Sequence, residues 1–385
     1  MFHQTEHHSR GPIRNGRGGS RMIRKRLFLA GVLAVALSAT GCGDDGAGGG
    51  ADANGVSKVR YVYCAETLAA SGAPFWIGEK LGYFAEEKIS LEMLPVAGGT
   101  GACLQLLAAG QADISAPSPD VLVQAAADGR NLDLRYFYEV APKFLFDATV
   151  LPDSPVRSFA DLKDATIGLA SLGGSFELFA KAGLRAAGVD PASVDFVAVG
   201  TEAAAAESLK KGDIDALVIN DVRYAALEAA GYQFRYLDKP GVTADLFGAG
   251  LLARNAWLTE NPEAAAGYAR AYTKSVLFAK ANPEAAIRIH WEQYPQFAPT
   301  GDRAKAMQAA LPVLKRRIDV IEDDGSAEKP YGQFTAESWQ AYVQFLGVQD
   351  KVKDVSAFYT NDVAAKIGAI DAAAVQAKAT SWPTS

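Results

Sequence analysis

The sequence predicts an α/β protein of two lobes, each built around a parallel β-sheet with helices on both faces. Strand-like and helix-like segments alternate along residues 59–220, a pattern typical of parallel sheets. The pattern Leu-x-x-Gly-x-x-Asp followed by an apolar run occurs twice, at residues 107–113 and again at 209–215. A helix–glycine–strand unit in the same place of two successive halves indicates two lobes of similar build.

The first lobe opens with the β-branched and aromatic run VRYVYC, which is typical of a strand. Gly110 is expected to end a helix in the left-handed conformation, in which glycine has no steric penalty. The predicted elements are, in order, a strand over 59–64, a helix over 74–84, a strand over 89–96, a helix over 98–109 and a strand over 112–116.

The second lobe repeats this order, with helices that end at Gly188 and Gly212. Two apolar segments that run into polar stretches, 144–156 and 246–258, bracket it and are predicted to link the lobes. Two crossings make a hinge, and two lobes on a hinge make a cleft. The predicted elements are strands over 164–170, 194–200 and 215–220, helices over 175–188 and 203–212, and tail helices over 261–280, 283–294, 302–318 and 336–346.

The N-terminal segment has the pattern of a secretory signal. A basic start around Met22 leads into a short apolar run, and small residues then precede Cys42. The small-small-Cys ending resembles a bacterial lipobox, which predicts lipidation of Cys42, although Ala39 stands where leucine is usual. An ordinary cleaved signal and a structural cysteine are the alternatives. Met22 is a second candidate for the true start.

The predicted domain organisation follows from these segments. A Gly/Asp-rich stretch after Cys42 cannot bury enough surface to fold, so it is interpreted as a flexible tether. The predicted parts are a signal peptide over 1–41, a tether over 42–57, lobe I over 58–148 and 249–370 with the helical tail, and lobe II over 149–248.

Charge and cysteine content exclude several functions. The chain has a formal net charge of −6, and its first 41 residues hold seven basic residues against one acidic residue, so the remainder is more acidic still. Nucleic-acid binding requires a basic face and is not expected. Cys64 and Cys103 are the cysteines that remain, and their spacing alone does not decide whether they pair.

Six sequence segments spread over some 300 residues carry a family resemblance. They are APFWIGEKLGYFAEEKISLEM, GGTGACLQLLAAGQADIS, LPDSPVRSFADLKDATIGLAS, LRAAGVDPASVDFVAVG, LKKGDIDALVIND and VSAFYTNDVAAKI. In this order they resemble extracytoplasmic solute-binding proteins of ABC importers. The resemblance is to the nitrate, taurine and alkanesulfonate binders and their relatives that bind thiamine pyrimidine precursors. It implies a periplasmic binding protein type II fold, in which two Rossmann-like lobes are joined by two hinge strands.

Ligands of open parallel sheets bind beyond the carboxyl ends of the strands, often at helix N-termini, and this rule selects the candidate residues. The glycines allow close backbone approach and the hydroxyls can hydrogen-bond, while the aromatic residues suit a flat ligand. Each has a structural alternative: Ser175 as a helix N-cap, Asn220 as a turn residue, and Phe75, Trp76 and Tyr138 as core. The predicted ligand-binding residues are Glu66, Thr67, Phe75, Trp76, Gly99, Thr100, Ser115, Ser118, Tyr138, Ser171, Gly174, Ser175 and Asn220.

These loops contain no strong cation cluster; Lys143 and Arg223 are the nearest basic candidates. A monoanion held by backbone N–H groups and a flat organic molecule remain alternative ligands. The expected function is capture of a sulfonate, aromatic carboxylate or pyrimidine by a monomeric, exported, lipid-anchored protein. It would deliver the solute to a membrane permease driven by an ATPase, without cofactor or metal. The identity of the solute is left open.

An enzyme is the alternative class, either of the thiamine-pyrimidine synthesis type or built on a Cys103–His290 pair. Such chemistry needs a nucleophile with a nearby base, and His290 is the one histidine beyond residue 8. The chain carries no Gly-x-Ser-x-Gly elbow, no phosphate loop and no Cys/His cluster for zinc. An exported sensor domain is a third interpretation. No catalytic residue is predicted.

Overall fold

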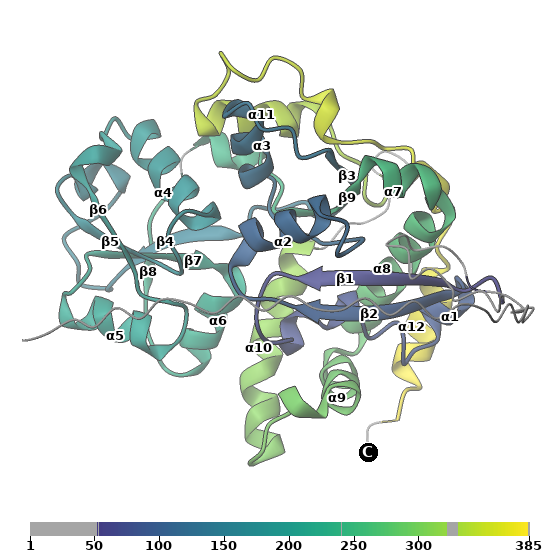
Figure 1. Ribbon diagram of the computed structural model, residues 1–385. Coiled ribbons are helices and arrows are strands. Elements are labelled where there is room, and N and C mark those ends of the chain that lie inside the picture. Colours follow the sequence, from purple (N-terminus) through teal and green to yellow (C-terminus); the bar gives the residue numbers. More distant parts are fainter. Residues whose placement is uncertain (1–51, 53, 240, 322–329, 384–385) are drawn as a thin grey trace, which may run out of the picture. The chain divides into compact units, whose positions relative to one another are not determined.

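The computed structural model describes residues 52, 54–239, 241–321 and 330–383. The predicted signal segment, Cys42 and most of the predicted tether lie outside these residues. The described residues fall within one compact unit, Ala47–Ser385. Its strands form two separate sets, one around β1 and β2 and the other around β4 to β8 (Figure 1).

The first set combines strands that are far apart in the sequence. β1 (Ser57–Tyr63) pairs in parallel with β2 (Ile89–Pro95), and β3 (Leu134–Ala141) pairs antiparallel with β9 (Ala249–Arg254). Two isolated bridges, Tyr61 to Ile114 and Ser115 to Leu252, connect these pairs through residues 114–115. The strand predicted over 112–116 is therefore reduced to two bridging residues, because Pro117 follows and has no N–H group to continue the ladder.

The prediction of one helix over residues 74–84 is wrong. A 3₁₀ helix, Ala70–Phe75, and a single turn, α1 (Tyr83–Glu86), replace it. Gly82 has a φ of 81° and so interrupts right-handed helix between the two. Gly78 packs closely against α8 (Pro262–Ala281), because a Cβ there would lie 2.6 Å from Ser275 Oγ. The next two helices along the chain are α2 (Gly99–Ala108) and α3 (Asp120–Ala127).

The second sheet has the strand order β6-β5-β7-β4-β8. β5 pairs in parallel with β6 and β7, whereas β4 is antiparallel to both β7 and β8. A small second core lies on one face of this sheet, around Leu217, Ile219 and Tyr224. The elements are β4 (Phe146–Val150), β5 (Thr166–Leu169), β6 (Asp195–Ala198), β7 (Ala216–Asn220), β8 (Arg235–Tyr236), α4 (Ser175–Ala186), α5 (Ala203–Lys211) and α6 (Asp221–Ala229).

The two sheets share one order of strands. Counting residues 114–115, the first reads β2-β1-(114–115)-β9-β3 and the second β6-β5-β7-β4-β8. The chain passes between the sheets twice, at 142–145 and at 237–248, and leads into β4 and then β9. Because each of these strands arrives from the other lobe, each runs against its parallel neighbours. The predicted two-lobed α/β fold is confirmed, with one antiparallel strand inserted in each sheet.

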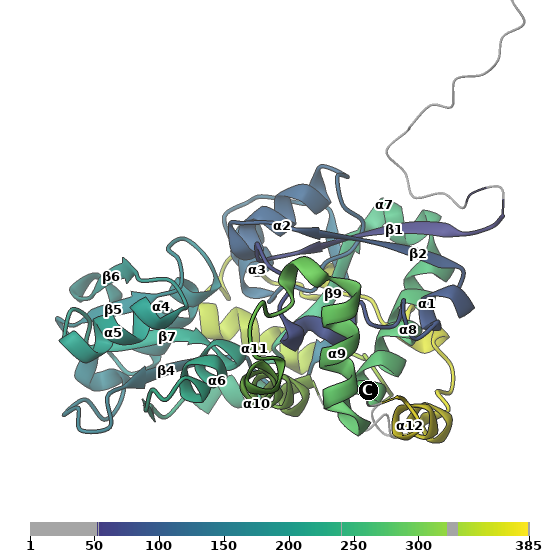
Figure 2. The same cartoon turned by 90° about the horizontal axis from the view of Figure 1, so that it is seen from below.

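The C-terminal third is helical, as predicted. Asn282 caps α9 by accepting from Ala285 N–H at 3.0 Å, and Gly347 ends α11 with a φ of 71°. α10 contacts α6 of the second lobe as well as α9, and α11 contacts both α3 and α4 (Figures 1 and 2). These helices are α7 (Asn255–Glu260), α8 (Pro262–Ala281), α9 (Pro283–Gln293), α10 (Arg303–Ile321), α11 (Ala336–Leu346) and α12 (Ala372–Thr380).

Candidate functional site

Two helix N-termini, one from each lobe, meet beyond the carboxyl ends of the strands. α2 begins at Gly99 and α4 at Ser175, and the Ser175 hydroxyl donates to the Thr100 hydroxyl at 3.4 Å. Gly98 and Gly99 have φ values of 93° and 61°, so the turn into α2 requires glycine. The first N–H groups of a helix have no partner within it and favour an acceptor or an anion. Gly174 is the N-cap of α4, so the Ser175 hydroxyl is not the cap and faces the other lobe instead.

A buried carboxylate that the sequence analysis missed adjoins these hydroxyls. Asp120 is the first residue of α3 and is 3% exposed. Burial raises the pKa of its carboxyl, while the hydroxyls of Ser118 and Ser175 lower it. The two hydroxyls are close enough to affect the carboxylate but do not form hydrogen bonds of normal geometry with it. Both carboxylate oxygens and Ser118 Oγ lack a hydrogen-bond partner among the described residues. Ser118 is a predicted site residue, whereas an Asp at a helix start is too common to signal a site.

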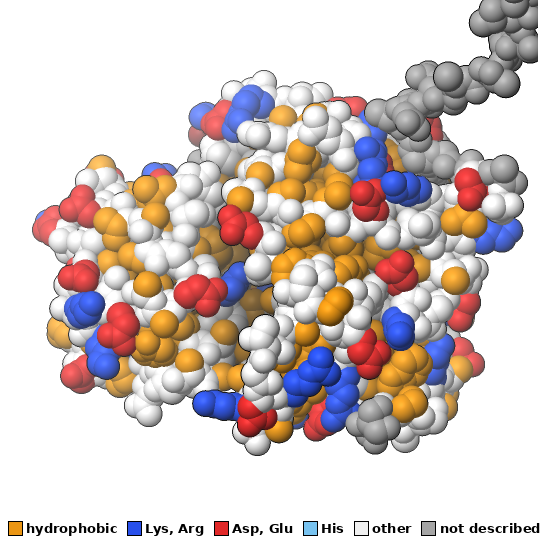
Figure 3. Space-filling model, turned by 60° about the horizontal axis from the view of Figure 1, so that its bottom comes forward, with side chains coloured by type: hydrophobic (Ala, Val, Ile, Leu, Met, Phe, Trp, Pro, Cys, Tyr) orange, Lys and Arg blue, Asp and Glu red, His pale blue; other side chains and the backbone are white. Residues whose placement is uncertain are grey.

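The sequence analysis also missed a largely buried arginine. Arg317 on α10 pairs with Asp221 at the start of α6, Nη2 to Oδ1 at 2.8 Å, and their side chains are 15% and 4% exposed. Burial raises the pKa of Asp221 and Arg317 lowers it. Burial also raises the pKa of Tyr63 at the end of β1, and the charge of Arg317 lowers it. Figure 3 shows that basic and acidic side chains are interspersed on the face that it draws.

The basic candidates from the sequence are occupied elsewhere. Arg223 pairs with the exposed Glu202 at 3.0 Å, and Lys143 donates to the Asp319 carbonyl at 2.7 Å. Asn220 caps α6, since its side-chain oxygen accepts from Arg223 N–H at 3.3 Å. Asn220 thus precedes Asp221 of the Arg317–Asp221 pair, and its Oδ1 accepts the capping hydrogen bond of α6.

The predicted aromatic residues separate into two environments. Phe75 is half-buried and stacks on Tyr272, with ring centroids 4.9 Å apart, and it also contacts Tyr61 at 5.3 Å. Burial raises the pKa of both tyrosines, and the charge of Arg317 lowers it. Trp76 is fully buried, and its indole N–H donates to His290 Nδ1 at 3.0 Å. It is therefore a core residue, the structural alternative to ligand contact.

Tyr138 and Ser115 already have partners within the first lobe. The Tyr138 hydroxyl lies 2.6 Å from that of Thr273, and its ring lines a small apolar cavity with Tyr272 and Ile318. Ser115 is completely buried and donates to the Val62 carbonyl at 2.8 Å. Their polar atoms support the sheet and helix packing around the site.

The remaining predicted residues lie in exposed loops. Glu66 and Thr67 follow β1, and Ser171 follows β5, so these loops extend beyond the carboxyl ends of equivalent strands. A Cys64–Cys103 disulfide ties the first of these loops to α2, with the Cα atoms 5.7 Å apart. It holds the Glu66–Thr67 loop and the start of α2 in one place. The sequence left this pairing open.

Two further features bear on chemistry. Among the described residues, no helix is long and apolar enough to span a bilayer, and no group of three His, Cys, Asp or Glu side chains is arranged to hold a metal ion. Cys103 is in the disulfide and His290 Nδ1 accepts from Trp76, so the pair considered for nucleophilic catalysis does not form. The candidate residues therefore offer hydroxyls, helix N-termini, an arginine and two carboxylates.

Comparison with known proteins identifies the family of the chain. Residues 70–286, more than half of the chain, match the model of the NMT1/THI5-like family. The chain belongs to this family. No curated protein matches the sequence.

Solved structures with this fold include both binding proteins and an enzyme. The alkanesulfonate-binding protein SsuA from Xanthomonas axonopodis pv. citri bound to MOPS is 17% identical, with 79% of this chain and 98% of that chain covered and a TM-score of 0.56. The nitrate-binding protein NrtA from Synechocystis PCC 6803 is 15% identical, with 85% and 91% covered and a TM-score of 0.55. The desulfurization enzyme DSZB is 12% identical, with 80% and 98% covered and a TM-score of 0.51. At these identities the likeness establishes the periplasmic binding protein fold.

Proposed function

We propose that this protein is the solute-binding component of an ABC importer and captures a small organic solute between its lobes. One observation carries the proposal: the N-termini of α2 and α4, on opposite lobes, bring the Thr100 and Ser175 hydroxyls to 3.4 Å. Both lie beyond the carboxyl ends of strands, where open α/β sheets bind ligands. A ligand that touches both helix ends favours the closed arrangement and shifts the population toward it.

The chemistry of the site supports an anionic or planar solute. A guanidinium carries five N–H donors, and the bond from Arg317 to Asp221 uses one of them. The α2 and α4 N-termini add backbone N–H groups that favour negative charge. Phe75 with Tyr61 offers an aromatic surface nearby. Sulfonates, aromatic carboxylates and pyrimidines match this combination.

Export and anchoring are proposed from the sequence. The basic start, short apolar run and small residues before Cys42 support a cleaved signal and a lipidated cysteine. The Gly/Asp-rich tether would then allow a monomer to move between solute and permease while attached to the membrane. We place the protein in the periplasm or on the cell surface, with the permease and its ATPase as partners.

Binding without catalysis is the part of this proposal that the fold alone does not decide, since DSZB shares it. The disulfide removes Cys103 as a nucleophile, and His290 is buried against Trp76. An enzyme of the thiamine-pyrimidine synthesis type would need such side chains in the cleft loops. An exported sensor domain would bind the same solute but would not stimulate a permease-linked ATPase.

A ligand screen tests the proposal directly. Residues 43–385 are screened by thermal shift and calorimetry against sulfonates, aromatic carboxylates, nitrate and pyrimidines. A ligand at a hundredfold excess over its Kd adds roughly 2.7 kcal/mol to the free energy of unfolding. Incubation with any hit, followed by product analysis, separates binding from catalysis. Binding with turnover would replace the importer role by an enzyme.

Matched variants test the position of the site. Thr100→Val with Ser175→Ala removes both hydroxyls at the lobe junction and should weaken binding of the hit at least about fivefold, since each lost hydrogen bond costs about 0.5–1.5 kcal/mol. The control, Thr259→Val with Ser193→Ala, removes the same two groups from positions whose hydroxyls bond to the nearby carbonyls of Asn255 and Asp190. Equal affinity of both double variants would place the ligand elsewhere.

A further inference from the structure

Asp120 differs from the other buried aspartates of the described chain. Asp113 bonds to Arg60 and Asp221 to Arg317, so each of these carboxylates faces a guanidinium. Asp120 is 3% exposed, and neither of its oxygens has a hydrogen-bond partner among the described residues. The groups that act on its pKa are the Ser118 and Ser175 hydroxyls and the first backbone amides of α3, with no cation among them.

The helix position accounts for only part of this arrangement. A carboxylate at the first turn of a helix is stabilised modestly by the helix dipole. Burial of a carboxylate without a hydrogen-bond partner or counter-ion costs more than this interaction returns. The balance is unfavourable in the absence of a further donor, so Asp120 has unused capacity for a cationic or N–H-rich group.

The surroundings of Asp120 belong to both lobes. α3 contacts α2 of its own lobe and α4 of the other, and the Ser175 hydroxyl that acts on Asp120 also donates to Thr100. Ser118 Oγ, on the same side, is buried without a hydrogen-bond partner among the described residues. In the proposed function, separation of the lobes would take Ser175 away from Asp120 and give a solute access to the carboxylate, which closure would then cover.

We propose that Asp120 binds an amino group of the solute. The Ser118 and Ser175 hydroxyls accept hydrogen bonds from the other N–H groups of that amine. An ammonium has three donors and no acceptor, and an aminopyrimidine presents two N–H groups, so either satisfies a carboxylate and adjacent hydroxyls. This inference rests on the proposed function and narrows it to solutes that carry an amine. The same pocket discriminates against amine-free analogues, because these leave the buried carboxylate unpaired.

Three matched pairs of probes test the inference by calorimetry on residues 43–385. The pairs are taurine and ethanesulfonate, 4-(aminomethyl)benzoate and 4-methylbenzoate, and 4-aminopyrimidine and pyrimidine. In at least one pair the amine-bearing member should bind at least about tenfold more tightly, the difference expected for a charge-assisted hydrogen bond. Asp120→Asn should reduce this preference to within about twofold. Asp128→Asn, at the other end of the same helix and exposed, is the matched control and should keep it.

The outcomes separate this inference from the proposed function. Equal binding of both members in every pair that binds would overturn the role of Asp120 and leave solute binding intact. No binding by any of the six probes would overturn the proposed solute class, and the inference with it. A purely structural Asp120 predicts that Asp120→Asn lowers the free energy of unfolding. The ligand role predicts an unchanged or higher value, because an unpaired buried charge is removed. Asp120→Ser supplies the same two measurements if the Asn variant does not fold.

Discussion

The two lobes contain the same Gly-x-x-Asp unit in two different environments. In the first, the backbone N–H of Arg60 donates to Asp113 Oδ2 at 2.8 Å; in the second, that of Thr166 donates to Asp215 Oδ2 at 2.8 Å. Each aspartate thereby ties the segment after the glycine to a parallel strand of its own lobe, β1 in the first and β5 in the second. The repeated sequence pattern is explained by this shared backbone contact, which does not involve the ligand.

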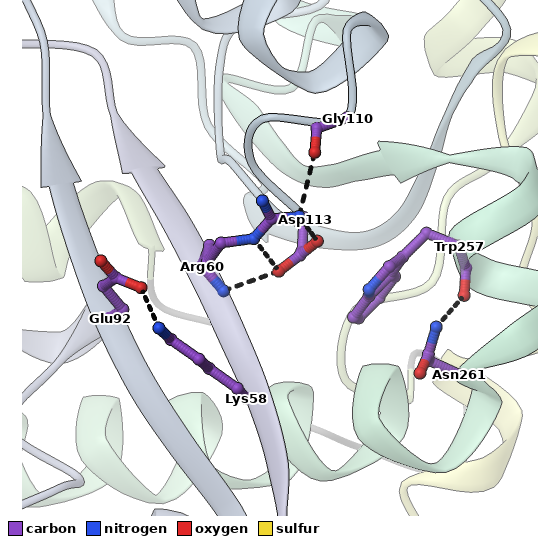
Figure 4. A network of polar contacts seen from close by, with 7 residues as sticks. All are labelled: Lys58, Arg60, Glu92, Gly110, Asp113, Trp257 and Asn261. Atoms are coloured by element: carbon purple, nitrogen blue, oxygen red, sulfur yellow. Dashed lines mark hydrogen bonds and ion pairs between the residues drawn. The ribbon is translucent and has the colours of Figure 1, made fainter. Parts of the chain in front are cut away.

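The side chains around the two units differ. Asp113 is fully buried and also accepts from Arg60 Nε at 3.0 Å and Nη2 at 2.6 Å, and the same Nη2 reaches the Gly110 carbonyl (Figure 4). Asp215 is exposed, and a threonine stands where the first lobe has arginine. One backbone motif thus tolerates either environment, and the energetic importance of its aspartate depends on burial.

The largest expected difference between the lobes is the cost of replacing this aspartate. Asp113→Asn breaks a buried ion pair and leaves Arg60 uncompensated, which costs about 3–5 kcal/mol of the free energy of unfolding. Asp215→Asn alters one exposed contact and should cost about 1 kcal/mol or less. Urea unfolding of the two variants measures both. Equal costs would show that the shared backbone contact, and not burial, determines the contribution of the aspartate.

A second difference is the disulfide of the first lobe. Alignment of the two units places Ala170 at the position of Cys64 and Ala205 at that of Cys103. Cys64→Ala with Cys103→Ala therefore gives the first lobe the residues of the second and should cost about 2–4 kcal/mol. Reductant should destabilise the native chain by a similar amount and leave the double variant unchanged. Sensitivity of the double variant to reductant would assign the effect to something other than this bond.

The comparison also shows what the sequence predicts well. Glycine-terminated helices and β-branched strands are specified locally, so Gly110, Gly188 and Gly212 are all found with positive φ. The helix over 74–84 failed because its apolar spacing reflects burial of a 3₁₀ turn and loop against α8, not helical geometry. Local patterns also cannot reveal that β4 and β9 run antiparallel, because their direction follows from the two crossings.

The site is less predictable than the fold, for a physical reason. The topology of the sheets determines which loops meet, and the proximity of Thr100 to Ser175 follows from that topology. The charged members depend on distant contacts: Arg317 and Asp221 are 96 residues apart in sequence, and Arg317 lies in an ordinary Lys/Arg-rich helix segment. The role of Asp120 becomes visible only through its burial and its missing partners.

Acid sensitivity should also differ between the lobes. Burial lowers the pKa of His290 from 6.5 to about 4, partly offset by a backbone hydrogen bond to Leu68, and the second lobe has no histidine. The unfolded chain therefore binds the proton more readily, so the stability contribution is full above pH 6.5 and falls as the pH drops toward 4. At pH 5 the loss is about 2 kcal/mol relative to pH 8.

His290→Gln isolates this contribution, because glutamine keeps a hydrogen-bond acceptor for Trp76 and does not titrate in this range. The change in unfolding free energy between pH 8 and pH 5 should differ by about 2 kcal/mol between the variant and the native chain. Asp120, Asp147 and Asp221 have raised pKa values and act in the opposite direction, since the folded state holds their protons more tightly. They are present in both proteins and cancel in the difference. Identical pH profiles would mean that His290 titrates normally when folded.

The smallest expected difference concerns the two glycines of the repeated unit. Gly110 and Gly212 have φ values of 70° and 78°, so alanine at either position should cost about 1 kcal/mol after the gain in unfolded-chain rigidity is subtracted. A Cβ at Gly110 would lie 3.3 Å from the Arg254 guanidinium, whereas at Gly212 it meets nothing within 4 Å. Gly110→Ala should therefore be slightly the more costly, by a few tenths of a kcal/mol. Urea midpoints for the pair resolve this difference, and a larger cost at Gly212 would contradict the backbone equivalence of the two units.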